Sequence, residues 1–516
     1  MSASSPSMSR RQLAAAAALI LALVGAEPAA GHAIGGTFQL PVPLWLYLAG
    51  AGAAVAASFV VITLASRDVD GAAARAGYST RPLPSALAAV ARIGLRALGL
   101  AWWYGAIAAG ILVGDISPLP AVLLWIGIWV GLPIAAVLFG NPWPSLSPFR
   151  STYAALEWIG ARLGRDPLDL GLHYPRRLAR WPAVALLGAG LWAELILPGR
   201  GVAGTVAALM IGYTLLTLAG LVAFGPVAWL RNAELFEVEL GWFGRIGPLA
   251  RRSRTAALCS GCEEPCDPER CLDCPECATA AEDGERRPEL RPWIVGLTEV
   301  GRPGWSDVAF IMLALAGVTY DGLRETWGGA LMFRAIYPAV SAVFGPSSAI
   351  TFLLVDTLQL VVVLVAFLAA FLAVAFLTRA LGPGPSARLG PLAGRYAVTL
   401  LPIAGGYVIA HYLTLVIQGV VWLPSLLVDP LMGIAPQLDA IPVVVVWYLS
   451  VAAIVGGHIA GIALAHRLAL ADAPGRAIVA GLPMVALMVG YTVLSLGIIA
   501  APIVVDPGAA PAAMAR

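Results

Sequence analysis

The most concentrated chemistry in the sequence is a run of six cysteines, C-x2-C-x3-C-x4-C-x2-C-x2-C, between residues 259 and 277. Thiolates bind soft ions such as zinc and cuprous copper, and they also hold iron–sulfur clusters. Two C-x2-C pairs separated by eleven residues have the spacing of a structural zinc site with four thiolates. The candidate ligands are Cys259, Cys262, Cys266, Cys271, Cys274 and Cys277.

Zinc is the first prediction for this run, and an iron–sulfur cluster or copper is the alternative. The bacterial ferredoxin spacing C-x2-C-x2-C-x3-C-P does not match the order found here. A further alternative is an acidic loop whose cysteines bind nothing. Because four thiolates close the shell around an ion, the predicted metal-binding knuckle has a structural or regulatory role.

A second set of polar residues lies inside segments that are otherwise apolar. Glu194, Asp356, His411 and His458 fall within such runs, where an ionisable group is costly and usually functional. At about 1.5 Å per residue, their depths allow one shared site in the outer half of a membrane. Two imidazoles with one or two carboxylates suit a divalent metal that activates water. Proton relay, or hydrogen bonding between helices without chemistry, are the other interpretations.

The segments that carry these residues are predicted to be membrane-spanning helices. The 516-residue chain is 59% hydrophobic and 12% charged, about half the charged fraction of a soluble protein. A helix needs about 20 apolar residues to cross a bilayer. Ten such runs lie near residues 42–65, 93–114, 118–140, 182–199, 202–225, 306–322, 349–378, 396–424, 441–466 and 477–505.

The N-terminus and the arginine distribution predict a location and an orientation. Residues 1–31 have the arginines, apolar run and small residues of a secretory signal, with cleavage expected before His32. Arginines concentrate in the loops after odd-numbered spans. By the positive-inside rule, both mature ends lie outside and the cysteine-rich loop lies in the cytoplasm of a bacterial inner membrane. The cytoplasm keeps thiols reduced, which favours metal binding over disulfides.

The sequence thus predicts an all-α membrane protein, a polytopic bundle of about ten transmembrane helices with a cytoplasmic Cys-rich loop. The expected parts are a signal peptide (1–31), five spans (32–225), the loop with its knuckle (226–305) and five more spans (306–516). Two segments, STYAALEWIGARLG and NAELFEVELGWFGRIGPLA, suit helices on the membrane surface or helices packed on the bundle. A net charge of +2 predicts no nucleic-acid partner.

Several segments carry a family resemblance. They are GHAIGGTFQLPVPLWLYLAGAGAAVAASF, FGNPWPSLSPFRSTYAALEWIG, GVTYDGLRETW, GGYVIAHYLTLVIQG and IVGGHIAGIALAHRLAL. Together they resemble bacterial integral membrane proteins of the fenitrothion hydrolase family, named for cleaving an organophosphorus triester. The resemblance implies hydrolysis of apolar triesters or related esters that partition into lipid. It carries no catalytic motif, although His411, His458 and His466 fall within the last two segments.

Three hypotheses follow for the function. The first is a metal-assisted hydrolase in the membrane, with His411, His458, Asp356 and Glu194 as catalytic residues. The alternative is a proton-coupled or metal-handling transporter-like protein in which these residues carry protons or metal. The third is a structural subunit without chemistry of its own. No G-x-S-x-G, P-loop or H-E-x-x-H motif of a soluble enzyme occurs in the sequence.

Overall fold

The computed structural model describes most of the chain and leaves out ten segments. The described residues are 38–39, 43–65, 81–164, 168–253, 286–298, 303–384, 386–438, 441–501 and 504–505. The predicted signal peptide, His32 and all six cysteines lie outside these ranges. The signal peptide, its cleavage before His32 and the metal bound by the cysteines therefore stay predictions.

Helices dominate the described residues, and nine of them are long and apolar enough to cross a membrane. A tenth apolar helix, α8 (Trp181–Leu195), is shorter. The prediction of an all-α polytopic bundle with about ten spans is confirmed. The long helices are α2 (Leu44–Ala65), α3 (Ser85–Leu112), the continuous run α4 (Leu119–Ala121), η2 (Val122–Gly131) and α5 (Leu132–Phe139), α9 (Ala203–Asn232), α13 (Trp305–Leu323), α15 (Ala349–Leu381), α17 (Leu401–Val428), α18 (Val443–Asp472) and α19 (Ala477–Ala500).

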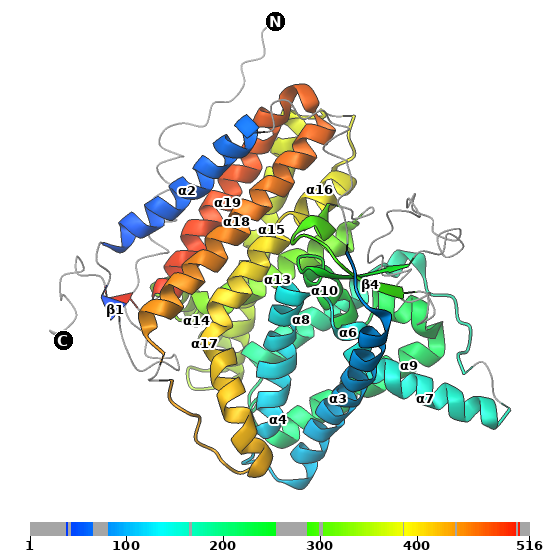
Figure 1. Cartoon of the computed structure of the whole chain (residues 1–516). Coiled ribbons are helices and arrows are strands. Elements are labelled where there is room, and N and C mark those ends of the chain that lie inside the picture. Colours follow the sequence, from blue (N-terminus) through cyan, green and yellow to red (C-terminus); the bar gives the residue numbers. More distant parts are fainter. Residues whose placement is uncertain are drawn as a thin grey trace, which may run out of the picture.

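The central position belongs to α13, which contacts α8, α15, α16, α17 and α19. Its apolar window is 78% buried, whereas that of α15 is 28% buried. Helices that are apolar on every face but bury only part of it suit contact with lipid. The ribbons of α2, α19, α18 and α17 follow one another side by side along one flank of the bundle (Figure 1). The polar residues carried by α13 are therefore largely surrounded by other helices.

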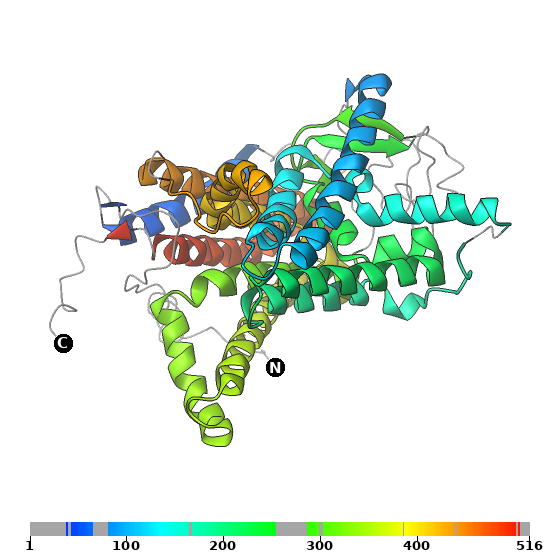
Figure 2. The same ribbon diagram turned by 90° about the horizontal axis from the view of Figure 1, so that it is seen from below.

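Shorter helices cover the ends of the bundle and fill its interior. Among them, α14 was not predicted from the sequence; it packs against α15, and Figure 2 shows the two in yellow-green projecting from the remaining helices. The short helices are α6 (Trp143–Leu146), α7 (Pro148–Arg162), η3 (Arg176–Leu178), α10 (Leu235–Phe243), η4 (Val295–Leu297), α14 (Trp327–Phe344), α16 (Leu389–Val398) and η5 (Pro474–Arg476).

Two small sheets join segments that are distant in the sequence. Strand β1 (Phe38–Gln39) pairs in parallel with β5 (Val504–Val505), with Phe38 opposite Val504. Strands β2 (Arg81–Pro82), β4 (Arg286–Leu290) and β3 (Leu249–Ser253) form an antiparallel sheet in that order. The β1–β5 pairing brings the described beginning and end of the chain to the same end of the bundle (Figure 1).

Helix α10 packs inside the bundle, which is one of the two interpretations of the segment NAELFEVELGWFGRIGPLA. All of its residues except Gly241 are buried, and it contacts α5, α8 and α17. The chain reaches it through a kink in α9 at Gly225, whose φ of 76° and ψ of 158° only glycine adopts readily. The expected boundary at residue 226 therefore falls inside α9, and the next segment returns to the core.

Candidate polar site in the bundle

Helices α13 and α17 bring the ionisable side chains of Asp321 and His411 into contact. Oδ2 of Asp321, near the end of α13, lies 3.0 Å from Nε2 of His411. The Tyr412 hydroxyl donates to the same carboxylate oxygen, also at 3.0 Å. The side chains of His411 and Asp321 are only 8% and 17% exposed. A carboxylate at this distance orients the imidazole and can exchange a proton with it.

An arginine one helical turn further balances the charge of this carboxylate. Arg324 places Nη2 3.5 Å from Oδ1 of Asp321, and its Nη1 donates to the Leu195 carbonyl at 2.9 Å. Because Leu195 is the last residue of α8, the guanidinium ties the end of α13 to the end of α8. A largely buried charge needs such a partner to offset the loss of hydration.

Two of the predicted acids lie around the same arginine. Oε2 of Glu194 accepts a hydrogen bond from Trp129 Nε1 at 2.6 Å, and the carboxylate interacts electrostatically with Asp321 and Arg324. Asp356 is half-buried and interacts electrostatically with Arg324. We call the set Glu194, Asp321, Arg324, Asp356, His411 and Tyr412 the polar cluster.

The fourth predicted residue, His458, lies apart from the polar cluster. Its side chain is fully buried on α18, with Nδ1 2.8 Å from the carbonyl of Ile454. The neighbouring Gly457 lies against the backbone of Pro402 on α17, about 13 Å along that helix from His411. His466 is further along α18, edge-on to Phe59. The structure therefore places Glu194 and Asp356 within electrostatic reach of Arg324, which pairs with the Asp321 that His411 contacts, and it leaves His458 apart.

A divalent metal was expected to bind these predicted residues together. Within the described ranges, no group of three or more His, Cys, Asp and Glu side chains could hold a metal ion. His411 and Asp321 contact each other directly, and His458 is too far along its helix to join them. The divalent metal at these residues stays a prediction.

Sequence reasoning gave no site role to Asp321, Arg324 and Tyr412. Asp321 falls at the end of the apolar run predicted near residues 306–322. The available signal was the spacing Asp-x-x-Arg in GVTYDGLRETW, because residues three apart on a helix face each other. The adjacent His411 and Tyr412 give no comparable signal, since only the packing of α17 on α13 directs both side chains to one carboxylate.

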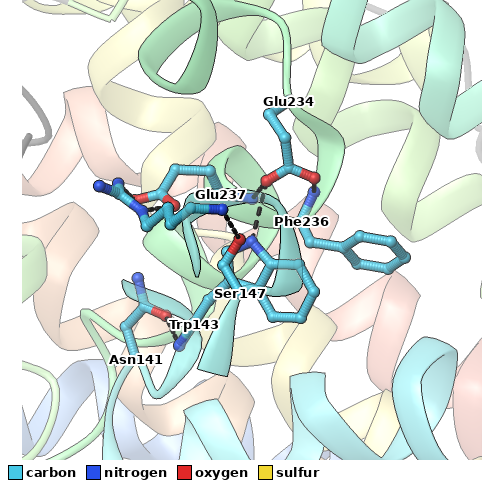
Figure 3. A network of polar contacts seen from close by, with 7 residues as sticks. Asn141, Trp143, Ser147, Glu234, Phe236 and Glu237 are labelled. Carbon is cyan, nitrogen blue, oxygen red and sulfur yellow. Dashed lines mark hydrogen bonds and ion pairs between the residues drawn. The ribbon is translucent and has the colours of Figure 1, made fainter. Parts of the chain in front are cut away.

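A second polar network holds α10 in place (Figure 3). Glu234 is fully buried before the first turn of α10, and each of its oxygens accepts two hydrogen bonds. Trp143 Nε1 and the Glu237 amide donate to Oε2 at 2.9 and 2.6 Å, while the Tyr213 hydroxyl and the Phe236 amide donate to Oε1. With four donors, this carboxylate is saturated and serves as a helix cap.

The same network anchors α10 to α7. Arg150 forms a bidentate ion pair with Glu237, at 2.7 and 3.2 Å. The Arg150 amide donates to Ser147 Oγ, which caps α7 (Figure 3). The polar groups of these residues form hydrogen bonds and ion pairs with one another. The network therefore fixes the position of α10 and of the α10 side chains that point into the bundle.

A small cavity of about 30 Å³ lies next to the polar cluster. Tyr412 lines it directly, and so does Trp129, the hydrogen-bond donor to Glu194. Buried Glu239 of α10 also lines it. The cavity thus adjoins the residues that hold Asp321 and Glu194.

The chain was compared with models of known protein families, with curated proteins and with solved structures. No match was found in any of the three comparisons.

Proposed function

We propose that this membrane protein transfers protons through the polar cluster, as a proton-coupled transporter does. The observation that carries the proposal is the Asp321–His411 contact at 3.0 Å, with Tyr412 bonded to the same carboxylate. Histidine changes its protonation state near neutral pH, and chains of acids and histidines in membrane helices are typical of proton relays.

The size of the adjoining cavity favours protons over a large substrate. Drug-sized ligands bind in pockets of roughly 300–1,000 Å³, whereas the cavity that Tyr412 lines has a volume of about 30 Å³. A water molecule needs roughly 10–15 Å³ of such space. The cavity is therefore matched to water, the usual carrier of protons between side chains.

Hydrolysis of an apolar ester is the second candidate. It is favoured by the orientation of the His411 imidazole by Asp321, which is the arrangement of a general base and its orienting carboxylate. The resemblance to the fenitrothion hydrolase family points to the same chemistry. A neutral triester would reach the site through the hydrocarbon core of the bilayer, which apolar molecules enter readily and which holds no water.

The proposals on metals concern the cysteine-rich stretch outside the described residues. Zinc bound by the two C-x2-C pairs would hold this stretch in a compact knuckle. We propose that the knuckle lies in the bacterial cytoplasm and that both ends of the mature chain lie outside the inner membrane. Elemental analysis of the purified protein should find zinc that is lost when all six cysteines become serine. Zinc retained by that variant would contradict the proposal.

Reconstitution into liposomes tests the two candidate functions side by side. Liposomes with a trapped pH-sensitive dye and an inward-driving potassium diffusion potential report proton entry. We expect the wild type to admit protons and Asp321→Asn to fall to the level of empty liposomes, because an amide cannot exchange a proton with His411. Asp472→Asn is the matched control, since Asp472 is a comparably buried acid, paired with Arg395 away from the cluster.

The same liposomes are then incubated with an apolar phosphotriester that carries a nitrophenol leaving group. Nitrophenol release that depends on Asp321, without proton entry, would favour hydrolysis over proton transfer. Wild-type proton entry no faster than that of empty liposomes would contradict the proposed function directly.

A further inference from the structure

The cavity beside the polar cluster is built in a regular way from five helical segments. Each segment contributes a pair of residues four apart, which lie one above the other on a helix face. The pairs are Trp129 and Pro133, Leu187 and Leu191 of α8, Glu239 and Phe243 of α10, Ala314 and Val318 of α13, and Val408 and Tyr412 of α17, with Val130 completing the lining.

Two acids of the polar cluster lie one helical turn from residues that line the cavity. Glu194 follows Leu191 by three residues on α8, and Asp321 follows Val318 by three residues on α13. Both carboxylates therefore lie one helical turn beyond the cavity, at about 5 Å along the helix axes. Tyr412 belongs to both features, because it lines the cavity and donates to Asp321.

Glu239 is the one acidic residue that lines this cavity. It is 7% exposed, and its Oε2 is buried with no hydrogen-bond partner within the described part of the chain. A buried carboxylate oxygen without a hydrogen-bond partner is unfavourable, so it indicates a bound water molecule. By contrast, Glu234 of the same segment is satisfied by four protein donors.

We propose that the cavity binds water that connects Glu239 to Tyr412 and makes Glu239 the next proton-carrying group after Asp321 and His411. This proposal rests on the proposed proton transfer and extends it into the bundle. A cavity of about 30 Å³ has room for one or two water molecules. Glu239 and the Tyr412 hydroxyl, which can still accept a hydrogen bond, supply the polar partners that such water needs.

The side chains around Glu239 support this assignment. The remaining lining is apolar apart from Trp129 and Tyr412, and the Trp129 Nε1–H is already donated to Glu194. On its own segment, Glu239 interacts electrostatically with Glu234, which has the same charge and cannot donate a hydrogen bond to it. No cation pairs with Glu239 in the described residues. Water is the remaining partner that this geometry offers.

Radiolytic footprinting of the intact protein in detergent tests for the water without any functional assay. Hydroxyl radicals made by X-rays oxidise buried side chains only where water lies beside them, and mass spectrometry locates the oxidation. We expect oxidation of Phe243 and Tyr412, which line the cavity, and none of Phe371, which is buried elsewhere. Ala314→Leu fills the cavity, and Glu239→Leu removes its acid; each should abolish the oxidation of Phe243.

Proton entry into liposomes tests the role of Glu239. We expect Glu239→Gln and Ala314→Leu to lose proton entry, while Asp472→Asn retains it. Phe243 protected as well as Phe371 would overturn the inference, because the cavity would be dry. Normal proton entry in both Glu239→Gln and Ala314→Leu would overturn it while the proposed function stands. Oxidised Phe243 without wild-type proton entry would support the water site and contradict the proposed function.

Discussion

Among single residues, Glu234 shows how many hydrogen-bond donors one buried carboxylate needs. It is fully buried and accepts four hydrogen bonds, two of them from the side chains of Trp143 and Tyr213. Asp321 is organised differently, because His411, Tyr412 and Arg324 share its two oxygens and the side chain is 17% exposed. The first arrangement suits a structural cap, and the second leaves a group that can exchange protons.

The hydrogen bond from Trp143 to Glu234 should contribute measurably to stability. Trp143→Phe keeps the aromatic packing but removes one donor from a buried carboxylate, which should cost about 1–3 kcal/mol. The midpoint of thermal unfolding in detergent measures the effect. Trp192→Phe is the control, since Trp192 donates to the neutral hydroxyl of Thr357 in a part-buried setting and should lower the midpoint less. Equal midpoints for the two variants would contradict the assigned role of Glu234.

At the scale of elements, apolar content predicts which segments become helices but not how those helices pair. The ten apolar runs and the all-α class followed from composition and spacing, because a bilayer admits few other structures. The return of α10 into the core did not follow, since an amphipathic segment suits a surface or an interior equally well. The pairing of Asp321 with His411, in place of His411 with His458, depends on the packing of α17 on α13.

The kink at Gly225 should control the placement of α10. Gly225→Ala forces a side chain into a backbone conformation that costs about 1–3 kcal/mol outside glycine, so we expect lower thermal stability and loss of proton entry. Gly212→Ala on the same helix is the matched control. No atom lies within 4 Å of the added methyl there, and alanine is favoured in a helix by about 0.5–1 kcal/mol. A Gly225 variant as stable as the Gly212 variant would refute the importance of the kink.

At the scale of the whole molecule, the β1–β5 pairing joins the two described ends of the chain. An even number of membrane crossings between them is the simplest route to this arrangement, and the described residues contain ten apolar helices, one of them the shorter α8. The arginine-rich loops predict which end of the bundle faces the cytoplasm. On this prediction, the polar cluster would lie toward the outer ends of α8 and α13.

Cysteine labelling checks this topology. In a background with the six native cysteines replaced by serine, Gln39→Cys and Val505→Cys should react with a membrane-impermeant maleimide from the same side. Leu178→Cys, in the arginine-rich segment η3, should react only from the opposite side. Labelling of Gln39→Cys and Val505→Cys from different sides would contradict the pairing, and labelling of Leu178→Cys with them would contradict the predicted orientation.

The two intramembrane histidines allow the most direct test of the central claim that His411, paired with Asp321, carries protons. His411→Gln and His458→Gln make the same chemical change at two buried positions, and proton entry into liposomes is measured for both. We expect folded His411→Gln protein to admit no protons and folded His458→Gln protein to admit them as the wild type does. Proton entry that survives in His411→Gln would contradict the account.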